Sequence, residues 1–187
     1  MTNPKGGGLT LKQLADLHQV SAAEMRKILS EPSPMAIAAF KRDFDFSDAL
    51  EIEIARQMSD NAGVPLGEAL RLSAYATAVN CYFAQKKSDA GSRQDFWLAV
   101  TASRNTRGSE ARGSLPVTGF GPGEYWAEMH YTGSFGAIMG EISESIGRDQ
   151  ILHPDSDPAR IFMANVSAAE RRLRKRAVDL GIDLNDQ

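Results

Sequence analysis

Residues 9–29 read LTLKQLADLHQVSAAEMRKIL and contain two signals for the start of a helix. Thr10 with Gln13, and Ser21 with Glu24, each fit a capping box. In this device a hydroxyl accepts a free backbone N–H of the first helical turn, and the side chain three residues later reaches back. Two starts this close leave room for a first helix of about two turns and a connection of about three or four residues. We therefore expect two short helices joined by a tight turn.

The apolar residues of this stretch recur at helical spacing. They are Leu11, Leu14 and Leu17 on one face of the first helix, and Met25 and Ile28 on one face of the second. Two helices that cross steeply need a small side chain at their closest approach. Ala15 supplies such a side chain beside Leu14. The pattern predicts that the two helices pack directly against each other.

The segment 14–21 (LADLHQVS), followed by Met25 and Ile28, resembles the helix-turn-helix unit of bacterial regulators such as the lac-repressor and mercury-resistance-regulator families. The resemblance covers about the first 30 residues. In those families a small Ala packs the helix crossing, Val-Ser opens the recognition helix, and a Gly usually occupies the turn. Gln19 replaces that Gly here, so it must accept an unusual backbone angle while it carries a side chain.

The resemblance implies that the helix Ser21–Ser30 binds DNA in the major groove, with its early residues against base edges. The residues left outward are Ser21, Ala22, Ala23, Arg26, Lys27 and Ser30. Arg26 and Lys27 can read guanine O6 and N7 or hold phosphate, while the two alanines can only offer methyl contacts to thymine. Ser21, at a helix N-terminus, suits a phosphate oxygen. A helical hairpin used for protein contacts is the alternative interpretation.

The composition fits a globular protein that acts in a reducing cytoplasm. Hydrophobic residues make up 42% and charged residues 24% of the 187, proportions typical of soluble domains. The start of the chain lacks the apolar core of a signal peptide. The sequence contains no run of 18 apolar residues, so we expect no membrane-spanning helix. Cys81 is the single cysteine. The net charge of −3 argues against a protein coated in nucleic acid, but a DNA-binding surface needs only a local basic face.

We predict three segments and an α+β fold. Residues 1–8, with three consecutive glycines, would be a flexible arm, and residues 9–31 a helix-turn-helix module. The segment 31–34 (EPSP) should break the helix, because each proline removes a hydrogen-bond donor and restricts the residue before it. Residues 35–187 would form a mixed domain with buried helices and a small antiparallel sheet, used for oligomerisation or effector sensing.

In this larger domain we expect helices at 35–42, from Ser47 to a closing Gly63, and continuously over 66–86. The aromatic and β-branched segments 96–103, 117–120 and 125–132 read as strands. A helix capped by Ser92 and Asp95 is the alternative for 96–103. A helix capped at Ser134 should follow and end at Gly147. Its inner face would carry Phe135, Ile138, Met139, Ile142 and Ile146.

The C-terminal part repeats five letters of the first motif. Residues 166–170 read VSAAE, as do residues 20–24. We interpret this repeat as a shared capping solution, with a strand over 161–166 and a final helix capped by Ser167 and Glu170 that ends at Gly181. Arg171 and Arg174 occupy the positions that correspond to the inward-facing Met25 and Ile28. A second recognition helix is therefore excluded, because it would have to bury these two charges.

Other chemistry finds little support. A metal site is not expected, because the spacing of His18, His130 and His153 fits no metal-binding motif. The phosphate-binding pattern GxGxxG starts with the glycines at 119, 121 and 123 but lacks its last glycine. We therefore expect no cofactor. Trp97, Tyr125, Trp126, His130 and Tyr131 could line a pocket for a planar ligand, but an aromatic core of the sheet is the simpler interpretation. The basic cluster at 171–176 reads as a solvated helix face, or alternatively as a phosphate or acidic-partner site.

The sequence thus predicts a bacterial or prophage DNA-binding transcriptional regulator, for example a repressor, without catalytic activity. A dimer is expected because one small module buries little interface on DNA. Two alternatives remain. One is a phage small-terminase-like DNA-packaging subunit, which would assemble as a ring. The other is an enzyme or toxin whose site lies in residues 95–165, with Arg104, Glu124 or His130 essential for activity.

Overall fold

The computed structural model of the chain describes residues 8–30, 43–75, 77–88, 94–104, 125–152 and 160–184. Within these ranges seven helices accompany one three-stranded antiparallel sheet, so the predicted α+β class is confirmed. The predicted arm, the EPSP boundary, the helix over 35–42 and the strand over 117–120 lie outside the described residues, apart from Gly8. Every helix in the described ranges is too short or too polar to cross a lipid bilayer.

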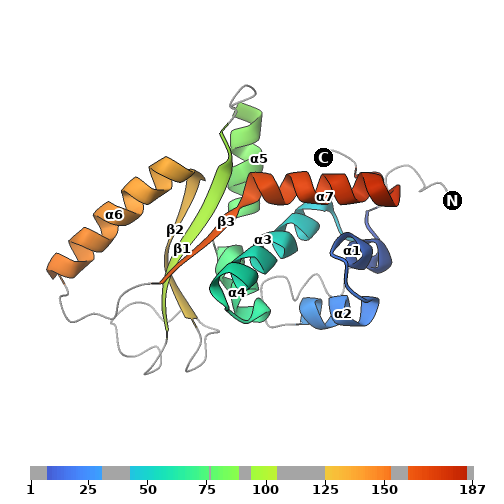
Figure 1. The fold of residues 1–187 in the computed structure, drawn as a ribbon, viewed down its shortest axis with the longest axis horizontal. Coiled ribbons are helices and arrows are strands. Elements are labelled where there is room, and N and C mark those ends of the chain that lie inside the picture. Colours follow the sequence, from blue (N-terminus) through green and yellow to red (C-terminus); the bar gives the residue numbers. More distant parts are fainter. Residues whose placement is uncertain are drawn as a thin grey trace.

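The helices and strands follow one another in the order shown in Figure 1. The helices before the sheet are α1 (Leu11–Leu17), α2 (Ala22–Ser30), α3 (Phe46–Ala62), α4 (Leu66–Tyr75) and α5 (Ala78–Ser88). The remaining elements are β1 (Phe96–Arg104), β2 (Tyr125–Ser134), α6 (Phe135–Leu152), β3 (Arg160–Asn165) and α7 (Val166–Leu180).

The sheet has the order β2-β1-β3, with β1 antiparallel to both neighbours. Successive side chains of a strand point to opposite faces of a sheet. Leu98 and Val100 of β1 therefore join the main core, while Ala99 between them joins Tyr131, Ile138 and Ile142 in a smaller cluster under α6. In Figure 1, α6 covers one side of the sheet, and α3 and α4 lie on the other.

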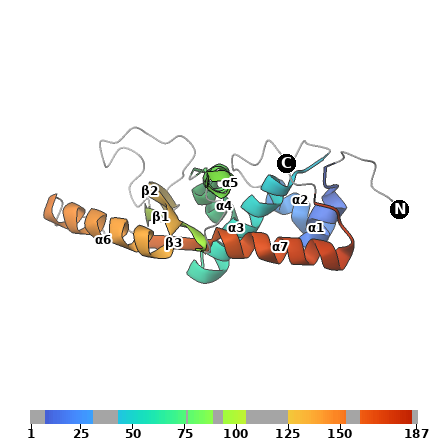
Figure 2. The ribbon, with the colours of Figure 1, turned by 90° about the horizontal axis from the view of Figure 1, so that it is seen from above.

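One continuous core links the first helices to the rest of the molecule. It runs from Leu9 through α3, α4 and the sheet to Ala177 in α7. Leu9 also forms an isolated backbone bridge with Phe44, directly before α3. Figures 1 and 2 show α7 extending from the sheet to α1, so the C-terminal helix spans both predicted modules. Helices α1 and α2 thus share their apolar interior with the rest of the described fold.

The predicted continuous helix over 66–86 is wrong, because it is divided into α4 and α5. Thr77 between them has φ +44°, in the left-handed region that a helix cannot contain. The break carries neither glycine nor proline, so its sequence gives no local signal. The predicted end of α6 at Gly147 is also wrong, because the helix continues to Leu152.

The start of α7 corrects the interpretation of the repeated VSAAE. The cap is Asn165, whose side chain accepts a hydrogen bond from the Ala168 N–H at 2.8 Å, and Ser167 is already inside the helix. Ser167 Oγ instead accepts a hydrogen bond from the Phe96 N–H at 2.9 Å. The second copy of the repeat therefore joins α7 to β1, and is not a second use of the same cap. The predicted end at Gly181 is confirmed, with φ +64°.

Candidate nucleic-acid interface

The first helix begins with the predicted capping box. The Thr10 side chain accepts a hydrogen bond from the Gln13 N–H at 3.3 Å, and the Gln13 side chain accepts one from the Thr10 N–H at 2.9 Å. At the start of α2, Ser21 Oγ accepts a hydrogen bond from the Glu24 N–H at 3.1 Å. Each cap satisfies backbone donors that have no partner within the first helical turn.

The turn between the two helices depends on Gln19, as expected. Its φ is +56°, in the left-handed region that glycine usually occupies. This conformation lets the Val20 N–H reach the Ala15 carbonyl at 3.1 Å and the Gln19 N–H reach the Asp16 carbonyl at 3.0 Å. Ala15 itself is buried at the crossing. The short side chain and the left-handed residue together set the angle between α1 and α2.

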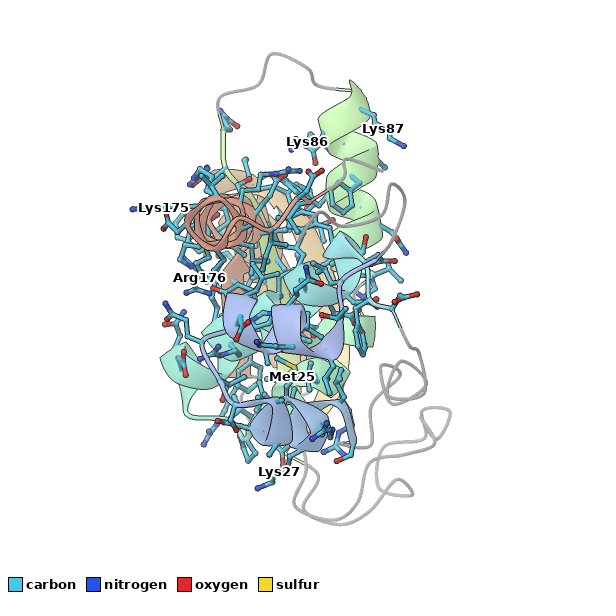
Figure 3. The ribbon with its side chains drawn as sticks, turned by 90° about the vertical axis from the view of Figure 1, so that its right-hand side faces the viewer. Met25, Lys27, Lys86, Lys87, Lys175 and Arg176 are labelled. Carbon is cyan, nitrogen blue, oxygen red and sulfur yellow. The ribbon has the colours of Figure 1, made fainter. Side chains whose placement is uncertain are left out.

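Helix α2 presents the predicted face to solvent. Met25 and Ile28 are buried, and so is Leu29, which the helical spacing did not single out. Ser21, Ala23, Arg26, Lys27 and Ser30 are exposed, and Ala22 is half-buried. Figure 3 shows Met25 pointing toward α1 and Lys27 pointing away from the body of the protein. Ser30 Oγ donates a hydrogen bond to the Lys27 carbonyl at 2.8 Å, so this hydroxyl already has one partner.

Two arginines from distant helices hold the end of α1. Arg176 Nη1 of α7 donates a hydrogen bond to the Leu17 carbonyl at 3.2 Å. Arg56 Nη1 of α3 donates one to the carbonyl of His18. The last carbonyls of a helix lack partners within it and carry partial negative charge, so guanidinium groups stabilise this end. The orientation of α1, and therefore of α2, is fixed by α3 and α7.

A buried carboxylate organises these contacts. Glu53 of α3 accepts hydrogen bonds from Arg172 Nε at 3.0 Å and from Arg176 Nη1 at 3.1 Å, and its Oε2 lies 3.4 Å from His18 Nδ1. Burial alone would raise the pKa of Glu53, but the neighbouring His18 ring and the two guanidinium groups outweigh burial and hold the pKa at about 2. Burial lowers the pKa of His18, so its ring is neutral at pH 7.

Sequence reasoning missed this group because its members lie far apart in the chain. The sequence shows His18 only as a histidine without metal-site spacing inside the 14–21 segment, and no local pattern singles out Glu53. The partners of Glu53 in α7 are 119 and 123 residues away. Within the described residues no group of three His, Cys, Asp or Glu side chains could hold a metal ion.

The basic cluster of α7 is largely paired with carboxylates. Arg171 contacts Asp95 at 2.7 Å, Arg174 contacts Glu170 at 2.7 Å, and Arg172 and Arg176 bind Glu53. Lys175 is exposed on the same helix. Arg171, Arg172 and Arg176 therefore fasten α7 to other parts of the fold, while Arg174 pairs within α7. Arg171, Arg172 and Lys175 are also exposed, so the predicted solvated face describes only part of what this cluster does.

The predicted aromatic group is divided between the two faces of the sheet. Tyr131 packs under α6, and the Trp97 ring packs against the Phe135 ring at a tilt of 59°, with ring centroids 5.2 Å apart. His130, paired with Val100, belongs to the opposite face and is exposed. The side chains of Tyr125 and Trp126 lie outside the described residues, as do Glu124, His153 and the side chain of Arg104. The aromatic residues that are described do not form one pocket.

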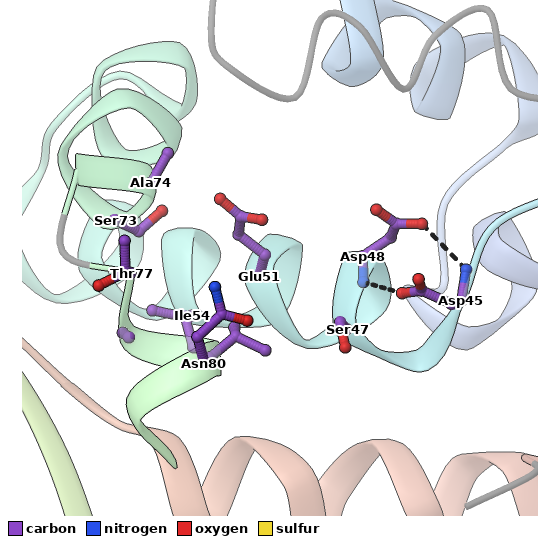
Figure 4. A pocket seen from close by; sticks show the side chains of 11 residues that line it. Asp45, Ser47, Asp48, Glu51, Ile54, Ser73, Ala74, Thr77 and Asn80 are labelled. Atoms are coloured by element: carbon purple, nitrogen blue, oxygen red, sulfur yellow. Dashed lines mark hydrogen bonds between the residues drawn. The ribbon is translucent and has the colours of Figure 1, made fainter. Parts of the chain in front are cut away.

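A hollow of about 160 Å³ lies between the start of α3, the end of α4 and the start of α5. Asp45, Asp48, Glu51, Ser73, Thr77 and Asn80 are among its lining residues (Figure 4). Asp45 and Asp48 form the capping box of α3, each accepting a hydrogen bond from the other's N–H at 2.9 Å. These two carboxylates are therefore explained by the start of the helix, and the hollow has no arrangement typical of catalysis.

Comparison of the chain with models of known protein families, with curated proteins and with solved structures found no match. The interpretation of α2 as a nucleic-acid interface therefore depends on its own geometry. That geometry is a firmly anchored helix whose exposed face carries two adjacent basic side chains.

Proposed function

We propose that this protein is a sequence-specific DNA-binding transcriptional regulator of bacterial or prophage origin, acting in the cytoplasm. One observation carries the proposal. Helix α2 packs Met25, Ile28 and Leu29 inward and leaves Arg26 and Lys27 exposed, on a side of the molecule away from its body. A helix with its side chains is about 10–12 Å wide, which fits the major groove of B-DNA.

The exposed residues suit different parts of the duplex. Arg26 can donate two parallel hydrogen bonds to guanine O6 and N7, which distinguish this base from the others. Lys27 can hold a phosphate, and Ser21 lies at the start of the helix, where a phosphate oxygen is favoured. The methyl groups of Ala22 and Ala23 can contact thymine. Together these side chains could both recognise bases and position the helix on the DNA phosphates.

The anchoring of α1 supports this function. A helix that reads bases must hold its side chains in one orientation, and supporting residues outside the contact surface provide this. Here Arg56 and Arg176 bind the carbonyls at the end of α1, and the core of α1 and α2 continues into α3. A helical hairpin that merely connected two parts of the chain would not need an exposed basic pair on its outer face.

The test starts with genomic DNA fragments captured by the purified protein, followed by anisotropy titration of the tightest fragment. Arg26→Ala with Lys27→Ala should weaken specific binding about 100-fold or more, because a good base contact contributes about 1–3 kcal/mol and a phosphate contact is lost as well. The circular dichroism spectrum should stay unchanged, since both side chains are exposed.

The matched control removes the same charge elsewhere. Lys87→Ala with Lys175→Ala alters two exposed lysines that Figure 3 shows on other parts of the molecule from Lys27. Its affinity should stay within about threefold of the unaltered protein. Equal affinity of the Arg26, Lys27 variant and the unaltered protein would overturn the assignment of this face, and absence of any captured sequence would overturn DNA binding.

A further inference from the structure

The carboxylate of Glu24 forms no hydrogen bond or ion pair in the part of the chain that the structure describes. The sequence predicts that it closes a capping box with Ser21, and only half of that box is present. Ser21 Oγ accepts a hydrogen bond from the Glu24 N–H at 3.1 Å. At the start of α1, by contrast, the Gln13 side chain also accepts a hydrogen bond from the Thr10 N–H. Glu24 therefore keeps a free carboxylate, and the residue is exposed.

The basic residues of α2 do not neutralise this carboxylate. Lys27 follows Glu24 by three residues, a spacing at which side chains of opposite charge can meet on a helix. Among the described residues no ion pair joins the two, and Lys27 points away from the body of the protein (Figure 3). Helix α2 thus presents an unpaired negative charge beside its two exposed cations, Arg26 and Lys27.

Glu24 and Arg26 flank the exposed side of α2. At 3.6 residues per turn, Lys27 lies near the middle of that side, with Arg26 on one flank and Glu24 on the other. The two flanking residues are about 160° apart around the helix axis and about 3 Å apart along it. This rise is close to the distance of about 3.4 Å between base pairs. In the major groove, the two side chains of opposite charge can therefore reach base edges within about one base step of each other.

The position of Glu24 within α2 also favours a base contact. It is the third residue of the helix. The early residues of a recognition helix are those that contact base edges, while later ones pass out of the groove. The free carboxylate thus lies where α2 would approach the bases most closely.

A carboxylate can contact only a small part of a DNA duplex favourably. It accepts hydrogen bonds and donates none, so the phosphates and the acceptor atoms of guanine and thymine repel it. The donors in the major groove are the amino groups at adenine N6 and cytosine N4. Adenine places the acceptor N7 beside its amino group, whereas cytosine itself offers no acceptor in this groove. A glutamate in the groove therefore favours cytosine.

We propose that Glu24 is a specificity-determining residue of α2, which accepts a hydrogen bond from cytosine N4 and rejects guanine and thymine at that position. The inference rests on the proposed DNA binding by α2 and adds the base that the carboxylate selects. With Arg26 reading guanine, the preferred DNA carries a guanine and a cytosine within about one base step of each other, where α2 enters the groove.

A carboxylate in the first turn also stabilises a helix, because the N-terminal end of a helix carries partial positive charge. This role alone would make Glu24→Gln less stable without altering which bases the protein prefers. The decisive measurement is therefore base preference at one position, since a purely structural role does not change it.

Selection from a pool of duplexes with a randomised central segment tests the proposal with the full chain. The unaltered protein should select a motif that contains one fixed cytosine. Glu24→Gln should select adenine in its place and leave the other positions unchanged, because a glutamine amide forms two hydrogen bonds with adenine N6 and N7. In anisotropy titrations, changing that C·G pair to T·A should weaken binding about tenfold or more for the unaltered protein, but less than about twofold for Glu24→Ala.

The matched control is Asp16→Asn, which removes the same charge from an exposed carboxylate of α1. It should leave the preference at every position of the motif unchanged. If Glu24→Gln selects the same motif as the unaltered protein, DNA binding stands and the role of Glu24 is overturned. An equal loss of preference at all positions also overturns it, since that result reports a loosened helix. If the unaltered protein selects no motif, the proposed DNA binding fails, and this inference fails with it.

Discussion

Arg176 donates a hydrogen bond to the carbonyl oxygen of Leu17, at 3.2 Å and across 159 residues of chain. The same Nη1 also binds Glu53 at 3.1 Å. The C-terminal helix α7 thereby holds the end of α1, while Glu53 holds α7 against α3. The presentation of α2 depends on a residue close to the C-terminal end of the described chain.

Arg176→Ala should lower the free energy of unfolding by about 2 kcal/mol, because it leaves the Leu17 carbonyl without this donor and a buried carboxylate with one fewer cation. The loss should be smaller than for a fully buried pair, since Arg172 still binds Glu53. Urea denaturation measures this difference. Lys175→Ala, an exposed neighbour, should change the stability by no more than about 0.5 kcal/mol. Equal stabilities of the two variants would contradict the assigned role of Arg176.

Stability should fall as the pH falls, in two stages. His18 has a folded-state pKa below its ordinary 6.5, so the unfolded chain binds a proton first and stability declines once the pH drops below 6.5. Glu53 has a folded-state pKa of about 2 against an ordinary 4.5, so its contribution is complete above pH 4.5 and is lost between pH 4.5 and 2. This second stage amounts to about 3 kcal/mol.

Glu53→Gln tests the second stage. The variant should be less stable at pH 7, because the cations around position 53 lose their counter-ion, and its stability should depend less steeply on pH below 4.5. Denaturation curves recorded across this range give the slope. Glu144→Gln, an exposed carboxylate of α6, serves as control and should preserve the steep slope. An unchanged slope in Glu53→Gln would mean that other carboxylates cause the acid sensitivity.

The helix caps and turns of the fold could be predicted from the sequence, but its long-range contacts could not. The capping box at Thr10, the left-handed Gln19 and the helix-ending Gly63 and Gly181 are each decided by a few neighbouring residues. The exposed Arg26 and Lys27 follow from the same short-range pattern. Short-range spacing therefore predicted the candidate interface well, including which of its faces lies outward.

The contacts that hold the candidate interface in place have no such signal. Glu53 meets His18 and Arg176 only because α3, α1 and α7 pack together, and their spacing in the chain is arbitrary. The break at Thr77 occurs at a position without glycine or proline nearby, so tertiary packing decides it. The half-exposed Phe135 shows the same limit, since periodicity identifies an apolar face but not how much of it the protein itself covers.

The repeated VSAAE offers a direct comparison of one sequence in two settings. Ser21→Ala should cost about 1 kcal/mol, the usual value for losing an exposed helix cap. Ser167→Ala should cost more, about 1–3 kcal/mol, because the buried N–H of Phe96 loses its acceptor. Thermal denaturation of both variants measures the difference. If Ser21→Ala were the more damaging change, the two serines would not have the different roles assigned to them.

Gln19 should be replaceable by glycine with a gain in stability. A left-handed conformation costs a residue with a Cβ about 1–2 kcal/mol, and glycine avoids that cost but loses more freedom on folding. Gln19→Gly should therefore stabilise the protein by up to about 1 kcal/mol. Gln19→Ala removes the same side chain but keeps the cost, so it should be nearly neutral. A stabilisation by alanine equal to that by glycine would contradict this explanation of the turn.

The salt dependence of DNA binding should distinguish the roles of Lys27 and Arg26. Each phosphate contact releases counter-ions, so removing one reduces the slope of log affinity against log salt concentration by about 1. Lys27→Ala should show this reduction and weaken binding to all sequences alike. Arg26→Ala should instead reduce the preference for the captured sequence over unrelated DNA, because a guanine contact contributes to discrimination. Lys175→Ala, on α7, should change neither the slope nor the preference. If Lys27→Ala altered sequence preference while Arg26→Ala altered only the slope, α2 would lie in the groove with its two basic side chains in exchanged roles.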